Sequence, residues 1–186
     1  MKGQQMTTPI SVAEYYEQVA QQEFADTLVQ AGPEIVNQPE LTATYEISGA
    51  DGGIYGLRIA GGQLELVPGG IAHSDMHVKS NIDEWRQGAS AGMANPFNYY
   101  LRRKVAIIKN FRGAVNLDLS NDNGENLEGQ IMFGGVDNPA VTVRMNADDY
   151  LALMSGKLNG QMAFMSGKLK FDGSMTLLLQ VAALNS

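Results

Sequence analysis

The amino-acid sequence predicts an α+β fold that combines an antiparallel strand meander, capped helices and an internal repeat. Apolar and polar residues alternate in short segments from Leu41 onward, and glycine-containing turns separate the segments, as is typical of strands joined by hairpins. Serine and asparagine residues stand directly before several apolar segments, where they are expected to cap helices. Matching residues recur about 65 positions apart, which favours a duplicated unit.

Residues 1–10 are expected to form a loose leader. Ser11 and Glu14 form the S-x-x-E pattern of a capping box, so a helix is expected to begin at Val12, and Gly32-Pro33 is expected to end it. Apolar side chains recur along this helix in one stripe: Val12, Tyr15, Tyr16, Val19, Ala20 and Phe24. The stripe suits three roles, which are to cover the sheet, to act as a lid, or to form the contact of a homodimeric interaction module.

The first half continues with four predicted strands, at residues 42–47, 54–59, 63–67 and 75–79. Asn81 is expected to cap a helix, because Asp83 and Glu84 follow where acidic residues interact favourably with the helix dipole. A second short helix is expected to begin at Pro96. Residues 104–109 and 114–119 then predict a further hairpin.

The second half predicts a similar order of elements. Strands are expected at residues 127–133, 141–145 and 169–171. Asn146 is expected to cap a helix that ends near Gly156, and residues 161–165 predict a short helix. Ser174 precedes the apolar segment Met175–Leu184, which could be helix or strand because periodicity does not separate the two in a short apolar run.

The internal repeat is visible in residues that recur at one spacing. Val78, Asn81, Asp83 and Trp85 are followed, 65 positions later, by Val143, Asn146, Asp148 and Tyr150. The spacing changes only in segments that contain Gly, Asn or Pro, where loops tolerate insertions. We therefore divide the chain into a leader and amphipathic helix at 1–40, a first repeat at 41–112 and a second repeat at 113–186, together forming one continuous compact unit.

Composition narrows the function classes. The chain has no cysteine, which excludes disulfides and thiolate chemistry and favours a reducing, cytoplasmic location. It contains no signal-like apolar region and no apolar run long enough to span a bilayer, so we expect a soluble protein. The net charge of −7 argues against general binding of nucleic acid, because phosphate contacts dominate that affinity.

Basic residues are nevertheless concentrated in one region of this acidic chain. Eight of the thirteen Lys and Arg residues lie between Arg58 and Arg112, and Arg102, Arg103 and Lys104 are consecutive. Such clusters are usually solvated faces. The alternative is a docking site for an anionic head group or a membrane surface.

A family resemblance appears in the second half. Ser155 to Asn159 reads SGKLN, Met162 to Lys170 reads MAFMSGKLK, and Gly173 precedes the last apolar segment. This stretch resembles the sterol carrier protein type-two family, although Gly160 stands where that family usually has proline. The resemblance implies an α+β fold in which helices cover one face of an antiparallel sheet. It also implies an apolar tunnel that holds fatty acids, fatty acyl chains, sterols or isoprenoids with low specificity.

Non-enzymatic lipid binding or transfer is therefore the leading functional hypothesis. Six of the ten methionines lie in the second half, and methionine adapts to ligands of different outline, although it also fills ordinary cores. The expected lipid-binding residues are Ile131, Phe133, Val143, Met145, Tyr150, Leu151, Met154, Met162, Met165, Leu169, Phe171 and Met175, with Trp85 and Tyr100 in the first half.

An enzyme acting on a hydrophobic small molecule is the alternative. His73, Asp75 and His77 would share one face if their segment were extended, as acid-base groups or metal ligands. Polar residues on a surface strand give the same pattern. The sequence shows no nucleophile motif, no phosphate or dinucleotide loop and no third histidine for a zinc site, so no catalytic residue, metal or cofactor is expected.

Overall fold

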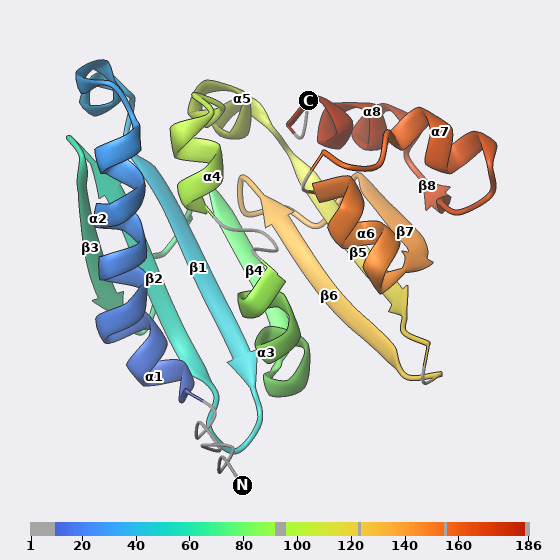
Figure 1. The fold of residues 1–186 in the computed structure, drawn as a ribbon, viewed down its shortest axis with the longest axis horizontal. Coiled ribbons are helices and arrows are strands. Elements are labelled where there is room, and N and C mark those ends of the chain that lie inside the picture. The colour runs from blue at the N-terminus through green and yellow to red at the C-terminus, as the bar shows by residue number, and fades with distance from the viewer. Residues whose placement is uncertain (1–9, 92–95, 123, 155, 185–186) are drawn as a thin grey trace, which may run out of the picture.

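The computed structural model describes residues 10–91, 96–122, 124–154 and 156–184, which form one eight-stranded sheet with helices in front of it (Figure 1). The strands are β1 (Leu41–Ser48), β2 (Gly53–Ala60), β3 (Gln63–Pro68), β4 (Met76–Asn81), β5 (Gly113–Ser120), β6 (Asn126–Phe133), β7 (Ala140–Asn146) and β8 (Lys170–Gly173). The α-helices are α1 (Val12–Glu14), α2 (Ala20–Gln30), α3 (Ile82–Ala91), α4 (Pro96–Leu101), α5 (Val105–Asn110), α6 (Ala147–Met154), α7 (Gly160–Met165) and α8 (Met175–Leu184). A π-helical segment, Tyr15–Val19, joins α1 to α2, and a 3-10 helix, Pro33–Asn37, follows α2. Within these residues, no helix combines the length and apolar character required to cross a bilayer.

The predicted helix caps are present. Ser11 Oγ accepts a hydrogen bond from the Glu14 amide at 3.1 Å, and α1 begins at Val12 as predicted. Asn81 Oδ1 accepts from the amides of Asp83 and Glu84, both at 2.9 Å. Asn146 and Ser174 cap α6 and α8 in the same way. Each cap satisfies amides that have no partner within their own helix.

The strand order is β3-β2-β1-β4-β6-β5-β7-β8. β1 runs parallel to β4 and β5 runs parallel to β7, whereas the other neighbouring pairs are antiparallel. The sheet is therefore mixed, which corrects the purely antiparallel sheet that was expected. Parallel neighbours require a crossover connection, and side-chain hydrogen bonds hold the first one in place. Thr44 Oγ1 accepts from the Ile71 amide at 3.0 Å, and Thr42 Oγ1 accepts from the Asp75 amide at 2.9 Å.

Helices cover one face of the sheet, as expected for this α+β fold. Tyr45, Leu57 and Ile131 lie on the covered face and are buried. Arg58, the chain neighbour of Leu57, points to the opposite face and is only partly buried. Alternation of this kind is typical of a sheet with one solvated side. The core consequently lies between the sheet and the helices, where the candidate site is also found.

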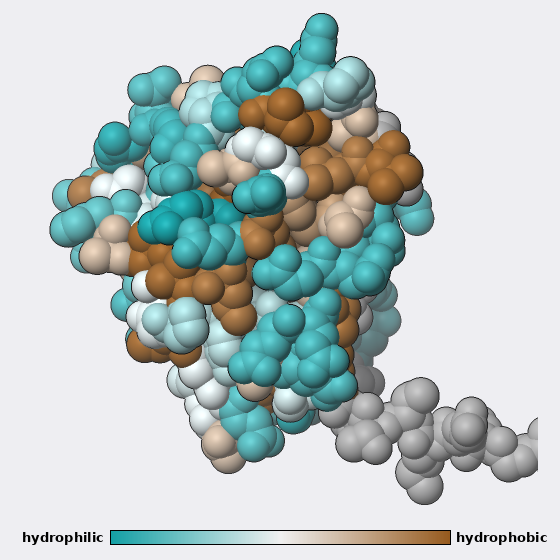
Figure 2. Space-filling view, turned by 90° about the vertical axis from the view of Figure 1, so that its left-hand side faces the viewer, coloured by the Kyte–Doolittle hydropathy of each residue, from teal (hydrophilic) through white to brown (hydrophobic). Residues whose placement is uncertain are grey.

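Figure 2 faces the side of the molecule that carries α2 and β3, where hydrophobic areas alternate with hydrophilic ones. β3 is an edge strand that ends at Pro68 and exposes Glu65, and both features limit pairing with another chain. Val29 on α2 is 87% exposed. It is an isolated surface residue of a kind common in proteins.

Two predictions for short apolar segments can be decided from the structure. Residues 104–109 were predicted as a strand, and this is wrong, because Val105–Asn110 forms α5. Val105 and Ile108 are fully buried while Ile107 between them is 40% exposed, so the burial follows the helical period. Packing overrides the strand preference of these β-branched residues. The segment Met175–Leu184, left open between helix and strand, is a helix.

Candidate ligand pocket

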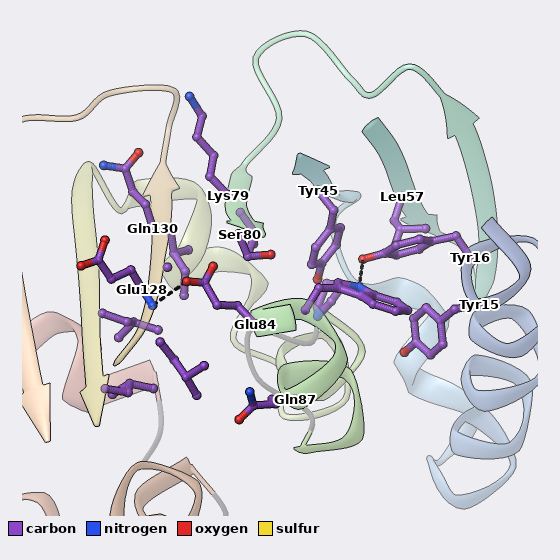
Figure 3. A pocket seen from close by; sticks show the side chains of 18 of the residues that line it. Tyr15, Tyr16, Tyr45, Leu57, Lys79, Ser80, Glu84, Gln87, Glu128 and Gln130 are labelled. Carbon is purple, nitrogen blue, oxygen red and sulfur yellow. Dashed lines mark hydrogen bonds between the residues drawn. The ribbon is translucent and has the colours of Figure 1, made fainter. Parts of the chain in front are cut away.

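A pocket of about 90 Å3 lies on the covered face, where the first half of the sheet meets the second (Figure 3). Strands β4 and β6 join there, and α3, α4 and the π-helical segment close it from the other side. Its wall is mainly apolar: Tyr15, Tyr16, Tyr45, Leu57, Val78, Trp85, Phe97, Leu117, Leu119, Leu127 and Ile131. Polar residues at the pocket are Lys79, Ser80, Glu84, Gln87, Glu128 and Gln130. An apolar wall with a few polar groups is typical of small-molecule sites.

An aromatic cluster forms one side of the pocket. Tyr15 and Tyr16 are consecutive in the π-helical segment, yet both contact Trp85, with ring centroids 5.4 and 6.2 Å away. Tyr16 also stacks on Tyr55, with centroids 4.6 Å apart and an interplanar angle of 17°. π-helical insertions often occur at functional sites. Here the insertion accompanies two neighbouring tyrosines that both belong to one wall.

The side-chain polar atoms of Trp85, Tyr15 and Tyr16 have partners within the protein. Trp85 Nε1 donates to the Tyr16 hydroxyl at 3.2 Å, and the Tyr15 hydroxyl donates to Glu23 Oε2 at 3.0 Å. Burial raises the pKa of Tyr16 and of Tyr45 well above the usual value, and burial followed by the charge of Glu23 raises the pKa of Tyr15. These phenols are therefore neutral at physiological pH, because a buried phenolate would be poorly solvated. The aromatic wall presents an uncharged surface to a ligand.

Glu84 connects the two halves of the sheet at the pocket. The β4–β6 ladder pairs Met76–Lys79 with residues 130–133 and continues no further along β4. Beyond it, Glu84 Oε2 accepts from the Asn81 amide and Oε1 accepts from the Glu128 amide, each at 2.7 Å. Glu84 therefore caps α3 and also reaches β6 (Figure 3). A single carboxylate spans the seam where the strands no longer pair.

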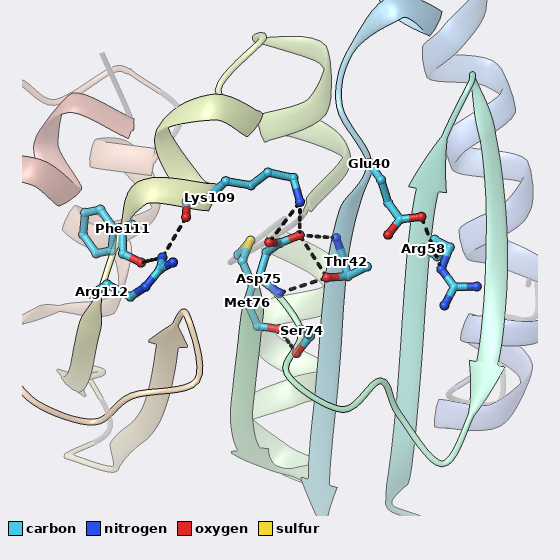
Figure 4. A network of polar contacts seen from close by, with 9 residues as sticks. All are labelled: Glu40, Thr42, Arg58, Ser74, Asp75, Met76, Lys109, Phe111 and Arg112. Carbon is cyan, nitrogen blue, oxygen red and sulfur yellow. Dashed lines mark hydrogen bonds and ion pairs between the residues drawn. The ribbon is translucent and has the colours of Figure 1, made fainter.

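The histidine and aspartate side chains do not form the expected site, and Asp75 contacts Thr42 and Lys109 instead (Figure 4). His73 lies in a turn with a φ of 56°, before β4 begins, so the extended segment that would align it with Asp75 and His77 is absent. Asp75 instead accepts hydrogen bonds from the Thr42 amide at 2.9 Å and from Lys109 Nζ at 3.2 Å. His77 Nε2 lies 3.2 Å from Glu46 Oε2. Asp75 thus has a structural role, tying β1 to α5.

The same conclusion holds for metal binding. The described residues contain no group of three or more His, Asp or Glu side chains placed to hold a metal ion. His73, Asp75 and His77 therefore do not form the metal or acid-base site that the sequence suggested. What the pocket offers is an apolar surface for binding.

The expected lipid-binding residues are distributed over several environments. Trp85 and Ile131 line the pocket. Six are buried in the core: Phe133, Val143, Met145, Tyr150, Leu169 and Tyr100. Leu151, Met154 and Phe171 are partly buried, whereas Met162, Met165 and Met175 are 62%, 74% and 48% exposed. A direct contact of these other residues with lipid stays a prediction.

Tyr100 differs from the other buried members of this set. It is fully buried on α4, and its hydroxyl is the one buried side-chain polar atom without a hydrogen-bond partner among the described residues. It does not belong to the pocket wall.

The expected docking residues lie at the turn between α4 and α5. Arg102 and Arg103 are exposed, and an oxygen of Glu34 lies 3.4 Å from the Arg103 guanidinium. Lys104 Nζ donates to the carbonyl of Ala183 on α8 at 3.2 Å. The cluster therefore contacts the last helix, while binding of an anionic head group stays a prediction.

Several residues that line the pocket were not among the expected lipid-binding residues. Tyr15 and Tyr16 were recognised as part of an apolar stripe, and the buried positions Val12, Tyr16, Ala20 and Phe24 show that this stripe packs inside the subunit. Tyr45, Leu117 and Leu119 carried only the alternation of ordinary strands. Alternation identifies the buried face of a strand, but which strands meet at a pocket depends on the strand order.

Comparisons with known proteins find similarity to sterol carrier proteins in part of the chain. Residues 97–186 match the SCP-2 sterol transfer family. Peroxisomal multifunctional enzyme A of Dictyostelium discoideum is 41% identical over 68 residues, which are 37% of this chain and 14% of that protein. Human sterol carrier protein 2 is 50% identical over 40 residues, which are 22% of this chain and 7% of that protein.

A solved structure is also similar. The sterol carrier protein domain 2 of Helicoverpa armigera is 28% identical and aligns with a TM-score of 0.35, covering 53% of this chain and 78% of that domain. The chain spans only a small part of the length of the two relatives named above. The similarity to the SCP-2 sterol transfer family therefore lies in residues 97–186, just under half of the chain.

Proposed function

We propose that this protein binds the apolar chain of a lipid, without catalysing a reaction, in the pocket between β4, β6, α3 and the π-helical segment. The observation that carries the proposal is the wall itself: aromatic and aliphatic side chains surround the pocket, and the polar atoms of Trp85, Tyr15 and Tyr16 are occupied within the protein. Such a wall gains free energy mainly from the apolar area that it removes from water.

The expected affinity follows from that area. Burial of about 300 Å2 of alkyl surface at ~25 cal/mol per Å2 gives roughly 7 kcal/mol before the costs of association, which is compatible with binding near the micromolar range. Because few directional contacts contribute, ligands of different outline should bind with similar affinity. Low specificity suits a carrier that binds and transfers fatty acids, fatty acyl chains, sterols or isoprenoids.

The pocket must widen to hold a complete chain. Its volume of about 90 Å3 is smaller than the ~300–1,000 Å3 of typical ligand pockets. The seam between Lys79 and Glu128 is the natural place for widening, because the Glu84 carboxylate and not a strand ladder spans it. We expect the ligand to enter there as the hydrogen bond from the Glu128 amide to Glu84 opens.

Tryptophan fluorescence provides the test. Trp85 is the single tryptophan of the chain and lines the pocket, so its emission reports on occupancy. Titration with oleate, below the concentration at which oleate forms micelles, should change the emission with saturation near the micromolar range. Mass spectrometry under native conditions should show a complex of one chain with the fatty acid.

A blocking variant and a matched control make the test specific. Gly129 lines the pocket, and a Cβ added there would meet only ordinary contacts, 3.8 Å from the Lys79 carbonyl oxygen and 4.0 Å from Leu117. Gly129→Leu should therefore fill the pocket without backbone strain and weaken oleate binding by about tenfold or more. Gly32→Leu is the control, because a Cβ at Gly32 meets nothing within 4 Å and Gly32 lies outside the pocket. Unchanged binding in a folded Gly129→Leu protein would refute the proposal.

A further inference from the structure

A set of large apolar side chains is exposed on α7 and α8, at the β8 edge of the sheet. The set, which we name the C-terminal apolar surface, consists of Met162, Phe164, Met165, Met175 and Leu179. Their exposed fractions range from 48% for Met175 to 74% for Met165. None of them belongs to the pocket wall. Large exposed apolar patches usually mark a surface that contacts a partner or a membrane.

The apolar sequence of helix α8 accounts for part of this exposure. Its sequence, MTLLLQVAAL, is apolar around most of its circumference. Leu177 and Leu184 are almost completely buried and fix the helix to the core, which leaves Leu179 64% exposed on another side. A helix that is apolar on all sides is normally surrounded by other apolar groups. In the described part of the chain, α8 has such groups on one side only.

Charges near this surface indicate what kind of partner it fits. Lys157, Lys168 and Lys170 are exposed around α7. Lys168 forms an ion pair with Asp149 of α6 at 2.7 Å, and Asp172 is the acidic residue within residues 156–184. The chain as a whole carries a net charge of −7. Apolar side chains bordered by lysines are typical of protein surfaces that bind anionic bilayers.

The basic cluster between α4 and α5 extends the same region. Lys104 Nζ donates to the carbonyl of Ala183 near the end of α8, which places Arg102 and Arg103 at the carboxyl end of that helix. Figure 1 shows α5, α8 and α7 along one end of the molecule. Arg102 has no acidic partner among the described hydrogen bonds and ion pairs, so its charge is available.

We propose that the C-terminal apolar surface docks on a lipid bilayer that contains anionic head groups, with Met162, Phe164, Met165, Met175 and Leu179 entering the interface. The lysines and Arg102 then lie at the level of the head groups. A second copy of the chain fits this surface less well, because a two-fold dimer would place the lysine-bearing surface against itself. The docking surface is separate from the pocket, so it goes beyond the proposed function.

Vesicle sedimentation tests the proposal. The full chain is mixed with phosphatidylcholine vesicles, with or without about 30 mol% phosphatidylserine, at low and high salt. Binding should require phosphatidylserine and should weaken at high salt. The double variant Met162→Ser/Met165→Ser, which changes exposed side chains only, should bind about tenfold more weakly. Lys157→Gln/Lys170→Gln should lose about fivefold per lysine.

Val29→Ser is the matched control, because Val29 is an exposed apolar residue on α2 and should leave vesicle binding unchanged. Equal sedimentation of the Met162→Ser/Met165→Ser variant and the unchanged protein would overturn the proposal. So would a concentration-dependent dimer that the same variant abolishes, with no vesicle binding. Oleate titration of Trp85 in each variant separates the two proposals, since loss of docking should leave pocket binding intact.

Discussion

The two halves of this protein share a backbone arrangement but use their apolar side chains differently. In the first half, β1 pairs antiparallel with β2 and parallel with β4, and in the second, β5 pairs antiparallel with β6 and parallel with β7. Asn81 and Asn146 end the parallel strands and cap the following helices. Duplication of the sequence stays a prediction, although this arrangement is compatible with it.

The difference lies in what covers each half. In the first half, α1, the π-helical segment and α2 pack on the sheet, and Tyr16 and Phe24 are buried. In the second half, α6 and α8 contact the sheet, while Met165 on α7 and Leu179 on α8 are exposed. A similar framework therefore accompanies an enclosed apolar wall in the first half and an exposed apolar surface in the second.

The largest expected effect is on stability, and it concerns Tyr16 in the π-helical segment that covers the first half of the sheet. Tyr16→Ala removes the stack on Tyr55 and the acceptor of the Trp85 indole, and should lower the free energy of unfolding by about 3–5 kcal/mol. Met165→Ala in the second half, at a side chain that is 74% exposed, should change it by less than about 0.5 kcal/mol. Urea denaturation measures both. Similar losses for the two variants would contradict the contrast between the halves.

Alkaline pH gives the next largest effect. Burial, opposed in part by Arg102, raises the pKa of Tyr99 to about 12, and burial raises the pKa of Tyr150 in the second half. Between pH 10 and 12 the unfolded chain loses phenolic protons that the folded chain keeps, so stability falls as pH rises. The stabilisation is complete below pH 10 and is lost as pH passes about 12.

Ultraviolet absorbance of tyrosinate, followed with circular dichroism, measures this effect. Native protein at pH 11 should show fewer ionised tyrosines than the unfolded chain, and ionisation of the remainder should coincide with unfolding. Arg102→Gln should raise the pKa of Tyr99 further, because the positive charge of Arg102 lowers it. Titration of all seven tyrosines near pH 10 in the folded protein would contradict the burial of both phenols.

The smallest effect compares two carboxylates at matching positions, 65 residues apart. Glu84 accepts from two backbone amides across the seam, whereas Asp149 lies 2.7 Å from Lys168 Nζ in a partly exposed ion pair. Glu84→Ala should cost about 1–2 kcal/mol of stability and speed the exchange of oleate. Asp149→Ala should cost less than about 1 kcal/mol. Stopped-flow fluorescence of Trp85 measures the exchange, and equal rates in both variants would show that Glu84 does not control the seam.

Local signals in the sequence were reliable guides to single elements. The S-x-x-E pattern at Ser11 located the start of the first helix, and Asn81, Asn146 and Ser174 located three others. These predictions succeed because a cap satisfies amides within one turn of itself. Residues 104–109 show the limit, since the burial of Val105 and Ile108 depends on the rest of the core.

The site was less predictable than the fold. Methionine content and the family resemblance directed attention to the second half, yet Trp85 and Ile131 are the members of the expected set that line the pocket. The pocket requires β4 to lie beside β6, strands that are separated by β5 and three helices in the chain. No local pattern encodes such a pairing.

The sequence by itself determined the α+β class, the caps and turns, the apolar stripe of the first helix and the likeness to a lipid-carrier family. Each of these depends on residues that are close together in the chain. The tertiary structure decided which strands run parallel, where the pocket forms, and which apolar side chains stay exposed. These properties depend on contacts between distant segments, because an apolar residue is buried only where another segment of the chain packs against it.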